Sequence, residues 1–354
     1  MEQPQPGKHK RRKRYAGTHP RTFEERYKEH DPTRFPEITA HVRAQGRTPA
    51  GSHVPILLQE VLTALTPQPG ETVLDCTLGY GGHAAALART GATVIAVDLD
   101  GEELARTRER LAQQGLKISA HQGNFAGIGA ILQTEGLQGV DCLLADLGVS
   151  SMQLDKPERG FGFKGAGPLD MRMDRTRGRT AADLVAQASV EELEQILHEN
   201  GDVQRAAELA AALKARPPRT TRDLADTALR AAGINPVTFR RRGAGDKHPA
   251  APVFQALRMA VNREPANLEQ LLRSLPWVLN PGGRAALITF HSGEERRVRD
   301  ALAAGLAEGL FDQADVNGIR PTAQEVRDNP RARSARLFVA RRAGNSNGPG
   351  EPGP

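Results

Sequence analysis

Apolar and polar positions change their period along residues 53–146, and these changes predict alternating strands and helices. Short β-prone apolar runs end in polar residues, whereas the segments before and between them, such as residues 53–65 and 102–113, repeat their apolar positions at helical spacing. This alternation is typical of a parallel, doubly wound α/β sheet, in which helices connect successive strands. The four strands predicted here are Thr72–Leu74, Thr93–Val97, Lys117–Gln122 and Val140–Ala145.

The strand pattern stops after the fourth strand, and a helical block follows. Three of its predicted helices begin with the S/T-x-x-D/E pattern of a capping box, in which side chain and backbone bond reciprocally at a helix start. Because these helices interrupt the sheet, we expect an inserted all-helical domain that covers the sheet's crevice. The predicted helices are Thr180–Ala186, Ser189–Asn200, Asp202–Ala215 and Thr221–Ala232, and the capping pairs are Thr180/Asp183, Ser189/Glu192 and Thr220/Asp223.

The α/β pattern resumes towards the C-terminus. Helices are predicted over Val253–Val261, Leu268–Leu279 and Glu294–Leu306, and strands over Arg284–Phe290 and Arg336–Ala340. The predicted parts are a basic, disordered tail (1–50), a first sheet part (51–154), the helical insertion (155–246), a second sheet part (247–342) and a disordered tail (343–354).

A glycine-rich turn follows the first strand and indicates a nucleotide-binding βαβ unit. Gly79, Gly81 and Gly82 allow a sharp turn and close backbone approach to a ligand, and Asp98 ends the next strand, where a carboxylate can bind ribose hydroxyls. The G-x-G-x-x-A pattern of residues 79–84 also suits a nicotinamide dehydrogenase.

Asp75, just before the turn, favours a different adenosyl cofactor. At an effective dielectric of about 20, a carboxylate there would repel a unit charge of a pyrophosphate roughly 6 Å away by nearly 3 kcal/mol. The same carboxylate would attract the cationic S-adenosylmethionine. Asp75 could instead cap backbone amides of the turn. Together with Asp98, Phe125 and Asp146 it stands at the carboxyl end of a predicted strand, where doubly wound sheets bind ligands.

Composition excludes some classes of protein and points weakly to others. The two cysteines, Cys76 and Cys142, have no C-x-x-C spacing, which argues against a disulfide framework or zinc site and suits a reducing cytoplasm. We expect no metal site, no membrane span and no secretory signal. The net charge of +6 and the basic run at residues 8–14 fit contact with a polyanion, although this run could equally be a solvated tail.

Several segments in order along residues 51–342 resemble the bacterial 16S rRNA (cytosine-N(4))-methyltransferase family (RsmH/MraW). They include His53-Val-Pro-Ile-Leu-Leu-Gln-Glu60, Gly79-x-Gly-Gly-His83, Asp146-Leu-Gly-Val-Ser-Ser-x-Gln-Leu-Asp155, Arg159-Gly-Phe-x-Phe163, Gly167-Pro-Leu-Asp-Met-Arg-Met-Asp174, Lys247-His-Pro-Ala250, Phe254-Gln-Ala-Leu-Arg258, Phe290-His-Ser292 and Asn329-Pro-Arg-Ala-Arg-Ser334. The chain departs from the family pattern at Gly293-Glu294-Glu295 and at Asn200-Gly-Asp-Val-Gln204, which puts fine contacts of the insertion in doubt.

The resemblance implies a class I S-adenosylmethionine-dependent methyltransferase that methylates the exocyclic amine of a decoding-centre (P-site) cytosine in 16S rRNA of the small ribosomal subunit. The family's cofactor contacts carry over onto Gly81, Gly82, His83, Asp98, Phe125, Asp146 and Gln153.

Other roles are predicted from position in the chain. Asp146 is the candidate acceptor for the amine. His291 is a candidate base-pocket residue, or else a histidine bonded to neighbouring backbone. Phe161 and Phe163 could stack on the base or simply pack. RNA contacts are predicted at Lys247, His248, Arg258, Asn262, Arg331 and Arg333, though such charges could also be ordinary surface charges. A dehydrogenase and a non-catalytic ribosome assembly factor remain as alternatives, and the choice between monomer and homodimer stays open.

Overall fold

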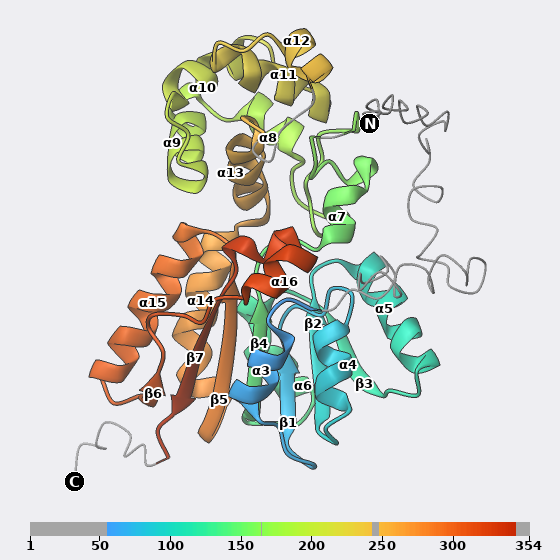
Figure 1. Ribbon diagram of the computed structural model, residues 1–354, viewed down its shortest axis with the longest axis vertical. Helices are drawn as coiled ribbons and strands as arrows, with labels where there is room; N and C mark the ends of the chain where they lie inside the picture. The colour runs from blue at the N-terminus through green and yellow to red at the C-terminus, as the bar shows by residue number, and fades with distance from the viewer. Residues whose placement is uncertain (1–54, 164, 243–247, 345–354) are drawn as a thin grey trace, which may run out of the picture. The chain divides into compact units, whose positions relative to one another are not determined.

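The computed structural model, which describes residues 55–163, 165–242 and 248–344, contains a seven-stranded sheet in the lower part of the view in Figure 1. The strand order is β3-β2-β1-β4-β5-β7-β6, and only β7 runs antiparallel to its neighbours. Because β2 and β4 pair with opposite edges of β1, the strand order reverses between β1 and β4. The strands are β1 (Thr72–Asp75), β2 (Thr93–Asp98), β3 (Ile118–Gln122), β4 (Val140–Asp146), β5 (Leu279–Thr289), β6 (Phe311–Ala314) and β7 (Arg336–Arg342).

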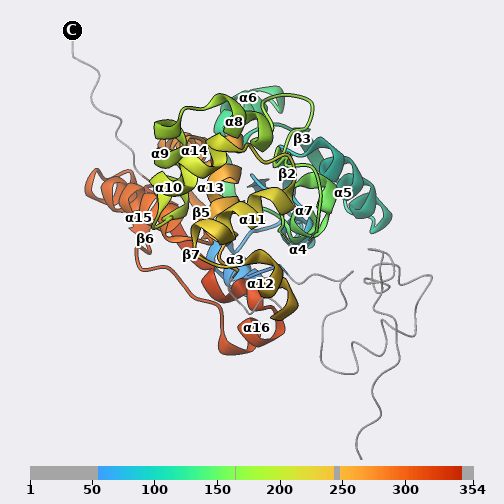
Figure 2. The same ribbon diagram turned by 90° about the horizontal axis from the view of Figure 1, so that it is seen from above.

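Alternate residues of the central strands face two separate hydrophobic cores. In β4, for example, Leu143 and Ala145 pack with α6 (Ile128–Thr134), α14 (Glu264–Val278) and α15 (Ser292–Ala307). Cys142 and Leu144 pack on the other face with α3 (Leu58–Leu65), α4 (Gly82–Ala88) and α5 (Gly101–Gln113). Figure 2 shows α6 and α14 on one side of the sheet and α3 and α4 on the other. Burial on both faces explains why the strands are continuous apolar runs.

A third core lies in the helical segment that follows β4. It joins α8 (Ala181–Gln187), α9 (Val190–Gly201), α10 (Ala206–Ala215) and α11 (Thr221–Ala231), and the chain continues through α12 (Pro236–Arg242). All three predicted capping boxes are present, at Thr180, Ser189 and Thr220. The prediction assigns α13 (Ala251–Asn262) to the second sheet part, yet its Val253, Phe254 and Leu257 pack in this helical core.

The fold class predicted from the sequence is confirmed, with local differences. β6 was not predicted, because only Phe311 of its four residues is buried. β5 begins at Leu279, so Asn280-Pro-Gly-Gly283 lies within the strand as an irregularity of the β4–β5 register instead of preceding it. Short segments not predicted individually are α7 (Ser151–Asp155), α16 (Ala323–Asp328) and 3-10 turns at Phe125–Gly127, Pro157–Arg159 and Pro330–Ser334.

Some predictions concern residues that the structure does not describe. These are the tail over residues 1–50, His53 and Val54 of the first motif, Lys247, and most of the C-terminal tail. Among the described residues, no helix is long and apolar enough to cross a membrane.

Candidate functional site

Side chains of helix α5 pack against the glycine turn that follows β1 and donate hydrogen bonds to it. Gly79 and Gly81 both have positive φ, and a Cβ added to Gly81 would lie 2.6 Å from the Thr107 methyl group. The Thr107 hydroxyl donates to the Gly79 carbonyl (2.6 Å), and the Arg110 guanidinium lies 3.5 Å above the Tyr80 ring and donates to the Tyr80 carbonyl. Gly81 is therefore required both for its backbone conformation and for the close approach of α5.

Two aspartates flank the reversal of strand order, at the carboxyl ends of β1 and β4. Asp75 is buried; its Oδ1 accepts from Thr77 N (3.0 Å), and its Oδ2 has no partner among the described residues. The alternative role of Asp75 as a cap of the turn is therefore present for one oxygen only. The same threonine contacts Asp146, because Asp146 N donates to Thr77 Oγ1 (2.7 Å). The buried Oδ1 of Asp146 also has no hydrogen-bond partner among the described residues.

These carboxyls titrate far from their usual range. Burial, opposed by bonds from Thr77, raises the pKa of Asp75 to about 7. Burial, followed by the charges of Asp75 and Glu294, raises the pKa of Asp146 to about 8. The Asp146 side chain is still 29% exposed, so a ligand can reach it. A cationic ligand would reverse the electrostatic cost of ionising both groups.

Asp98 links the turn to the end of β2. Its Oδ2 accepts from Gly79 N (2.7 Å) and its Oδ1 from Asp100 N (2.8 Å). A carboxylate has about four lone-pair sites, so it can still accept from ligand hydroxyls. Burial, only partly offset by these two bonds, raises the pKa of Asp98 to about 6.

His83, the second residue of α4, is a neutral histidine facing Asp146. Its Nε2 lies 3.1 Å from the Ile56 carbonyl, which can only accept, so Nε2 carries the proton and Nδ1 faces Asp146 Oδ2 at 3.7 Å. Burial lowers the pKa of His83 to about 4, despite its bond to Ile56. The sequence places this histidine correctly beside the turn, although nothing in the sequence indicates its tautomer.

His291 caps the start of α15, since its Nδ1 accepts from Glu294 N (3.3 Å). The alternative interpretation, a histidine bonded to neighbouring backbone, thus describes one ring nitrogen. The other, Nε2, lies 3.1 Å from Glu294 Oε1 but has no well-directed hydrogen bond. Burial raises the pKa of Glu294, but the nearby His291 ring and the Phe290 N–H outweigh it, and the pKa lies below its usual value.

A small pocket lies where His291 meets the end of β4. It is formed by residues that follow β4 and by acidic, basic and apolar residues of α13, α14 and α15. Its lining residues are Leu147, Gly148, Met259, Glu264, Pro265, Leu268, His291, Glu294 and Arg297.

Gln153 and Phe125, the other predicted cofactor contacts, lie in the segments that follow β4 and β3. Gln153 completes the capping box of α7, accepting from Ser150 N, and donates to Asp100 Oδ2 (3.0 Å). Phe125 begins the 3-10 turn after β3 and is partly buried. Gln153 is therefore held by Asp100, two residues from Asp98.

The predicted RNA contacts are dispersed. His248 stacks on Phe163 (ring centroids 4.2 Å apart), and burial lowers its pKa. Arg258 forms a two-pronged ion pair with Glu264 (2.9 and 2.8 Å). Arg331 pairs with Asp155 (3.0 Å), and Arg333 is exposed without an ion pair among the residues described.

Asn262 is placed differently from an RNA contact. Its buried side chain donates to the Met171 and Arg258 carbonyls and accepts from Met173 N. This engagement leaves little for RNA and suits a structural role. Phe161 is likewise buried in the helical core, as the packing alternative expects.

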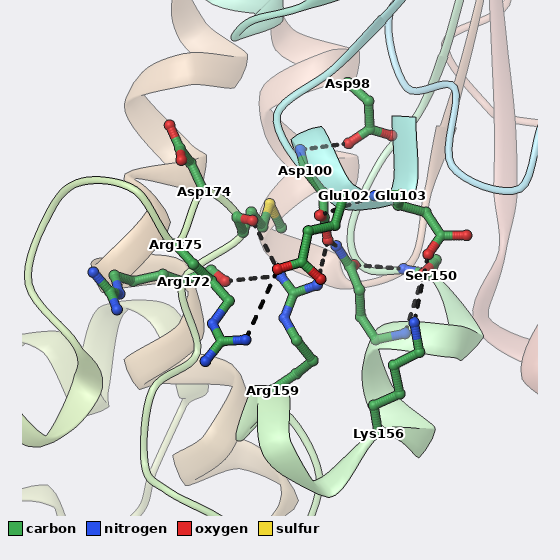
Figure 3. Close-up of polar contacts among 12 residues, drawn as sticks. Asp98, Asp100, Glu102, Glu103, Ser150, Lys156, Arg159, Arg172, Asp174 and Arg175 are labelled. Carbon is green, nitrogen blue, oxygen red and sulfur yellow. Dashed lines mark hydrogen bonds and ion pairs between the residues drawn. The ribbon is translucent and has the colours of Figure 1, made fainter. Parts of the chain in front are cut away.

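Sequence reasoning missed the buried ion pair between Asp100 and Arg159, drawn in Figure 3. It also missed Glu264, Thr107 and the burial of Glu294. Arg159 stands in a segment that resembles the family, and that was the one available signal; charged residues give no sign in a sequence that they are buried.

The strand order with a single reversed strand, the glycine turn after β1 and the carboxylates at the strand ends define a class I methyltransferase fold. A family model described as the MraW methylase family matches residues 50–343, and the chain belongs to this family.

Individual relatives agree with the family match. The chain is 41% identical, over 95% of its length and 98% of the relative's, to "Ribosomal RNA small subunit methyltransferase H 1" of Agathobacter rectalis. It is also 41% identical to "Ribosomal RNA small subunit methyltransferase H" of Sorangium cellulosum, over 87% and 97% of the two chains. An rRNA methylase structure from Streptococcus thermophilus matches at TM-score 0.38 and 12% identity, covering 81% of this chain and 92% of that one. This structural likeness is too low to add to the assignment.

Proposed function

We propose that this protein transfers a methyl group from S-adenosylmethionine to the exocyclic N(4) amine of a decoding-centre cytosine in 16S rRNA of the small ribosomal subunit. The observation that carries the proposal is the pair of buried, unpaired carboxyl oxygens of Asp75 and Asp146 at the reversal of strand order. The rRNA substrate is supported by the names of relatives that match nearly the full chain.

The residues of the site fit this donor. When bound, S-adenosylmethionine supplies an electrophilic methyl group on a positively charged sulfur. Three carboxyls with raised pKa values around the glycine turn favour a cation and oppose a pyrophosphate, which argues against the dehydrogenase. In this proposal Asp98 binds the ribose, Gly81, Gly82 and His83 form the wall beside it, and Phe125 and Gln153 complete the site.

Asp146 is the proposed acceptor for the cytosine amine. The amine lone pair is delocalised into the ring, so the nitrogen attacks poorly until a hydrogen-bond acceptor reorients it. The Asp146 side chain is 29% exposed, and its carboxyl group can turn to accept from the amine. As the new bond forms the amine becomes acidic, and the Asp146 carboxylate, which already accepts from the amine, can take up that proton.

The region beside Leu147, Gly148 and His291 is the proposed place for the target base, and the pocket there, which has room for about one water molecule, must widen to admit it. His291 Nε2 carries a proton, because Nδ1 accepts from backbone. It is buried beside Glu294, so in this proposal it donates to a ring nitrogen or carbonyl of the base once the pocket has opened. The base must leave its stack to enter, at a cost of a few kcal/mol. Positioning in such a pocket can offset roughly 7–11 kcal/mol of the barrier in favourable cases.

The cysteines favour the amine over the C5 carbon of the ring as the methylated atom. C5 attacks a methyl group only after a nucleophile, typically a thiolate, has added to C6. The chain has two cysteines, and both are buried: burial raises the pKa of Cys76 well above its usual value and that of Cys142 to about 11. Neither thiol is activated as such a nucleophile.

Label transfer tests the proposal. The protein is incubated with methyl-labelled S-adenosylmethionine and small subunits that lack the modification, in parallel with naked 16S rRNA. Wild type is expected to label RNA, and Asp146→Asn to lose most of the rate while keeping its melting temperature. Donor binding without label transfer to either RNA would favour the assembly factor, and preferential binding of NAD would favour the dehydrogenase.

A further inference from the structure

Arg159 and Asp100 form an ion pair that is almost completely withdrawn from water. Arg159 Nη1 lies 2.5 Å from Asp100 Oδ2, and the two side chains are 3% and 2% exposed. Burying two charges costs several kcal/mol each, and a buried pair is retained when further bonds satisfy its remaining groups. The further bonds show what the pair connects (Figure 3).

Asp100 belongs to the donor side of the site. Its backbone N–H donates to Asp98 Oδ1 (2.8 Å), and its Oδ2 also accepts from Gln153 Nε2 (3.0 Å). Its Oδ1 accepts from Glu103 N (3.2 Å), which caps α5. The position of Asp100 thus sets the orientation of Asp98 and Gln153, two of the proposed donor contacts.

The second terminal nitrogen of the Arg159 guanidinium contacts the loop of residues 171–173. Arg159 Nη2 donates to the carbonyls of Arg172 and Met173, both at 3.0 Å. Met171, in the same loop, has a positive φ of 62°, an unfavourable conformation for methionine that its surroundings must maintain.

Asn262 ties this loop to the inserted helices. Its Nδ2 donates to Met171 O and its Oδ1 accepts from Met173 N, both at 2.8 Å. Asn262 is the last residue of α13, whose Phe254 and Leu257 pack in the helical core. One continuous set of buried and part-buried hydrogen bonds therefore runs from Asp98 through Arg159 to α13.

We propose that Arg159 is a positioning residue that couples donor binding to RNA binding. This coupling rests on the proposed function. A donor that fixes Asp98 also fixes Asp100, and Arg159 then holds the 171–173 loop and α13 in the position that receives RNA. Coupling between two ligands is reciprocal and typically amounts to a 5- to 150-fold change in affinity. Lysine cannot replace Arg159, because an ammonium group cannot reach Asp100 and two carbonyls in the fixed geometry of a guanidinium.

The test measures binding alone. The affinity for unmodified small subunits is measured with and without saturating S-adenosylhomocysteine, for wild type, Arg159→Lys and Arg106→Gln. Arg106, an exposed residue of α5, serves as the matched control. Its guanidinium nitrogens form surface ion pairs with carboxylate oxygens of Glu102 (3.8 Å) and Glu103 (4.0 Å). Wild type and Arg106→Gln are expected to gain about tenfold in subunit affinity, whereas Arg159→Lys gains less than twofold with each ligand still bound.

An equal gain in all three proteins, or none in wild type, would overturn the coupling while leaving methyl transfer intact. A wild type that binds S-adenosylhomocysteine weakly and transfers no methyl group would instead overturn the proposed function. If Arg159→Lys does not fold, as judged by its melting temperature, Asp100→Asn replaces it. That variant keeps an oxygen to cap α5 but removes the charge, and an undiminished gain in it contradicts the proposal.

Discussion

Raising the pH from 6 to 8 is expected to strengthen S-adenosylmethionine binding, because Asp146 must ionise to favour a cation. The pKa of Asp146 is about 8 in the free protein. The group is therefore ionised in roughly 1% of molecules at pH 6 and in roughly half at pH 8. If the donor binds only the ionised form, its affinity rises by about 50-fold over this interval. Asp75, with a pKa of about 7, acts in the same direction.

Isothermal titration calorimetry across this pH range, in buffers of different ionisation enthalpy, measures both the affinity and the protons released. Asp146→Asn is expected to bind more weakly at pH 8 and to show a much shallower pH dependence. The comparison also removes any titration of the ligand itself, which both proteins experience. Asp300→Asn, an exposed change on α15, should behave as wild type. A wild-type affinity independent of pH, with no proton release, would refute the electrostatic argument.

Four further changes test the roles assigned to the turn, to Asp98 and to the N-terminal segment. Gly81→Ala is expected to lose donor binding, because its Cβ would meet the Thr107 side chain. Gly79→Ala serves for comparison: its Cβ would meet only Thr77 O at 3.8 Å, so the substitution costs chiefly the backbone strain of roughly 1–2 kcal/mol. Equal donor affinities of the two variants by calorimetry would contradict this. Asp98→Ala should weaken donor binding at least tenfold, about 1.4 kcal/mol, and an unchanged dissociation constant would remove the residue from the site. Deleting residues 1–47 should lower RNA affinity mainly at low salt in filter binding, and a loss of donor binding would contradict the assignment of this segment as a phosphate-binding tail.

The fold was predictable wherever one physical signal dominated. Buried parallel strands such as Val140–Ala145 are apolar on both faces, and capping-box sequences mark where helices of the insertion begin. β6 gave no such signal, because an edge strand with one buried residue has almost no apolar pattern. The sequence Asn280-Pro-Gly-Gly283 has the composition of a turn, and only pairing with β4 makes it part of a strand.

The site was predictable at the strand ends and not between elements. Asp75, Asp98 and Asp146 follow from the rule that parallel strands bring their carboxyl ends to one edge of the sheet. The Arg159–Asp100 pair joins residues 59 positions apart, and both types of side chain are ordinarily exposed. Asn262 has the same difficulty: its polar side chain suggests a surface contact, but tertiary packing places it inside, against backbone.

The identity of the methylated nucleoside tests the central claim most directly. Small subunits treated with the protein and S-adenosylmethionine are digested to nucleosides and analysed by mass spectrometry against authentic standards. Asp146, as the acceptor for the exocyclic amine, and the two buried, unactivated thiols predict N(4)-methylcytidine. The appearance of 5-methylcytidine, or of a methylated purine in its place, would contradict the account.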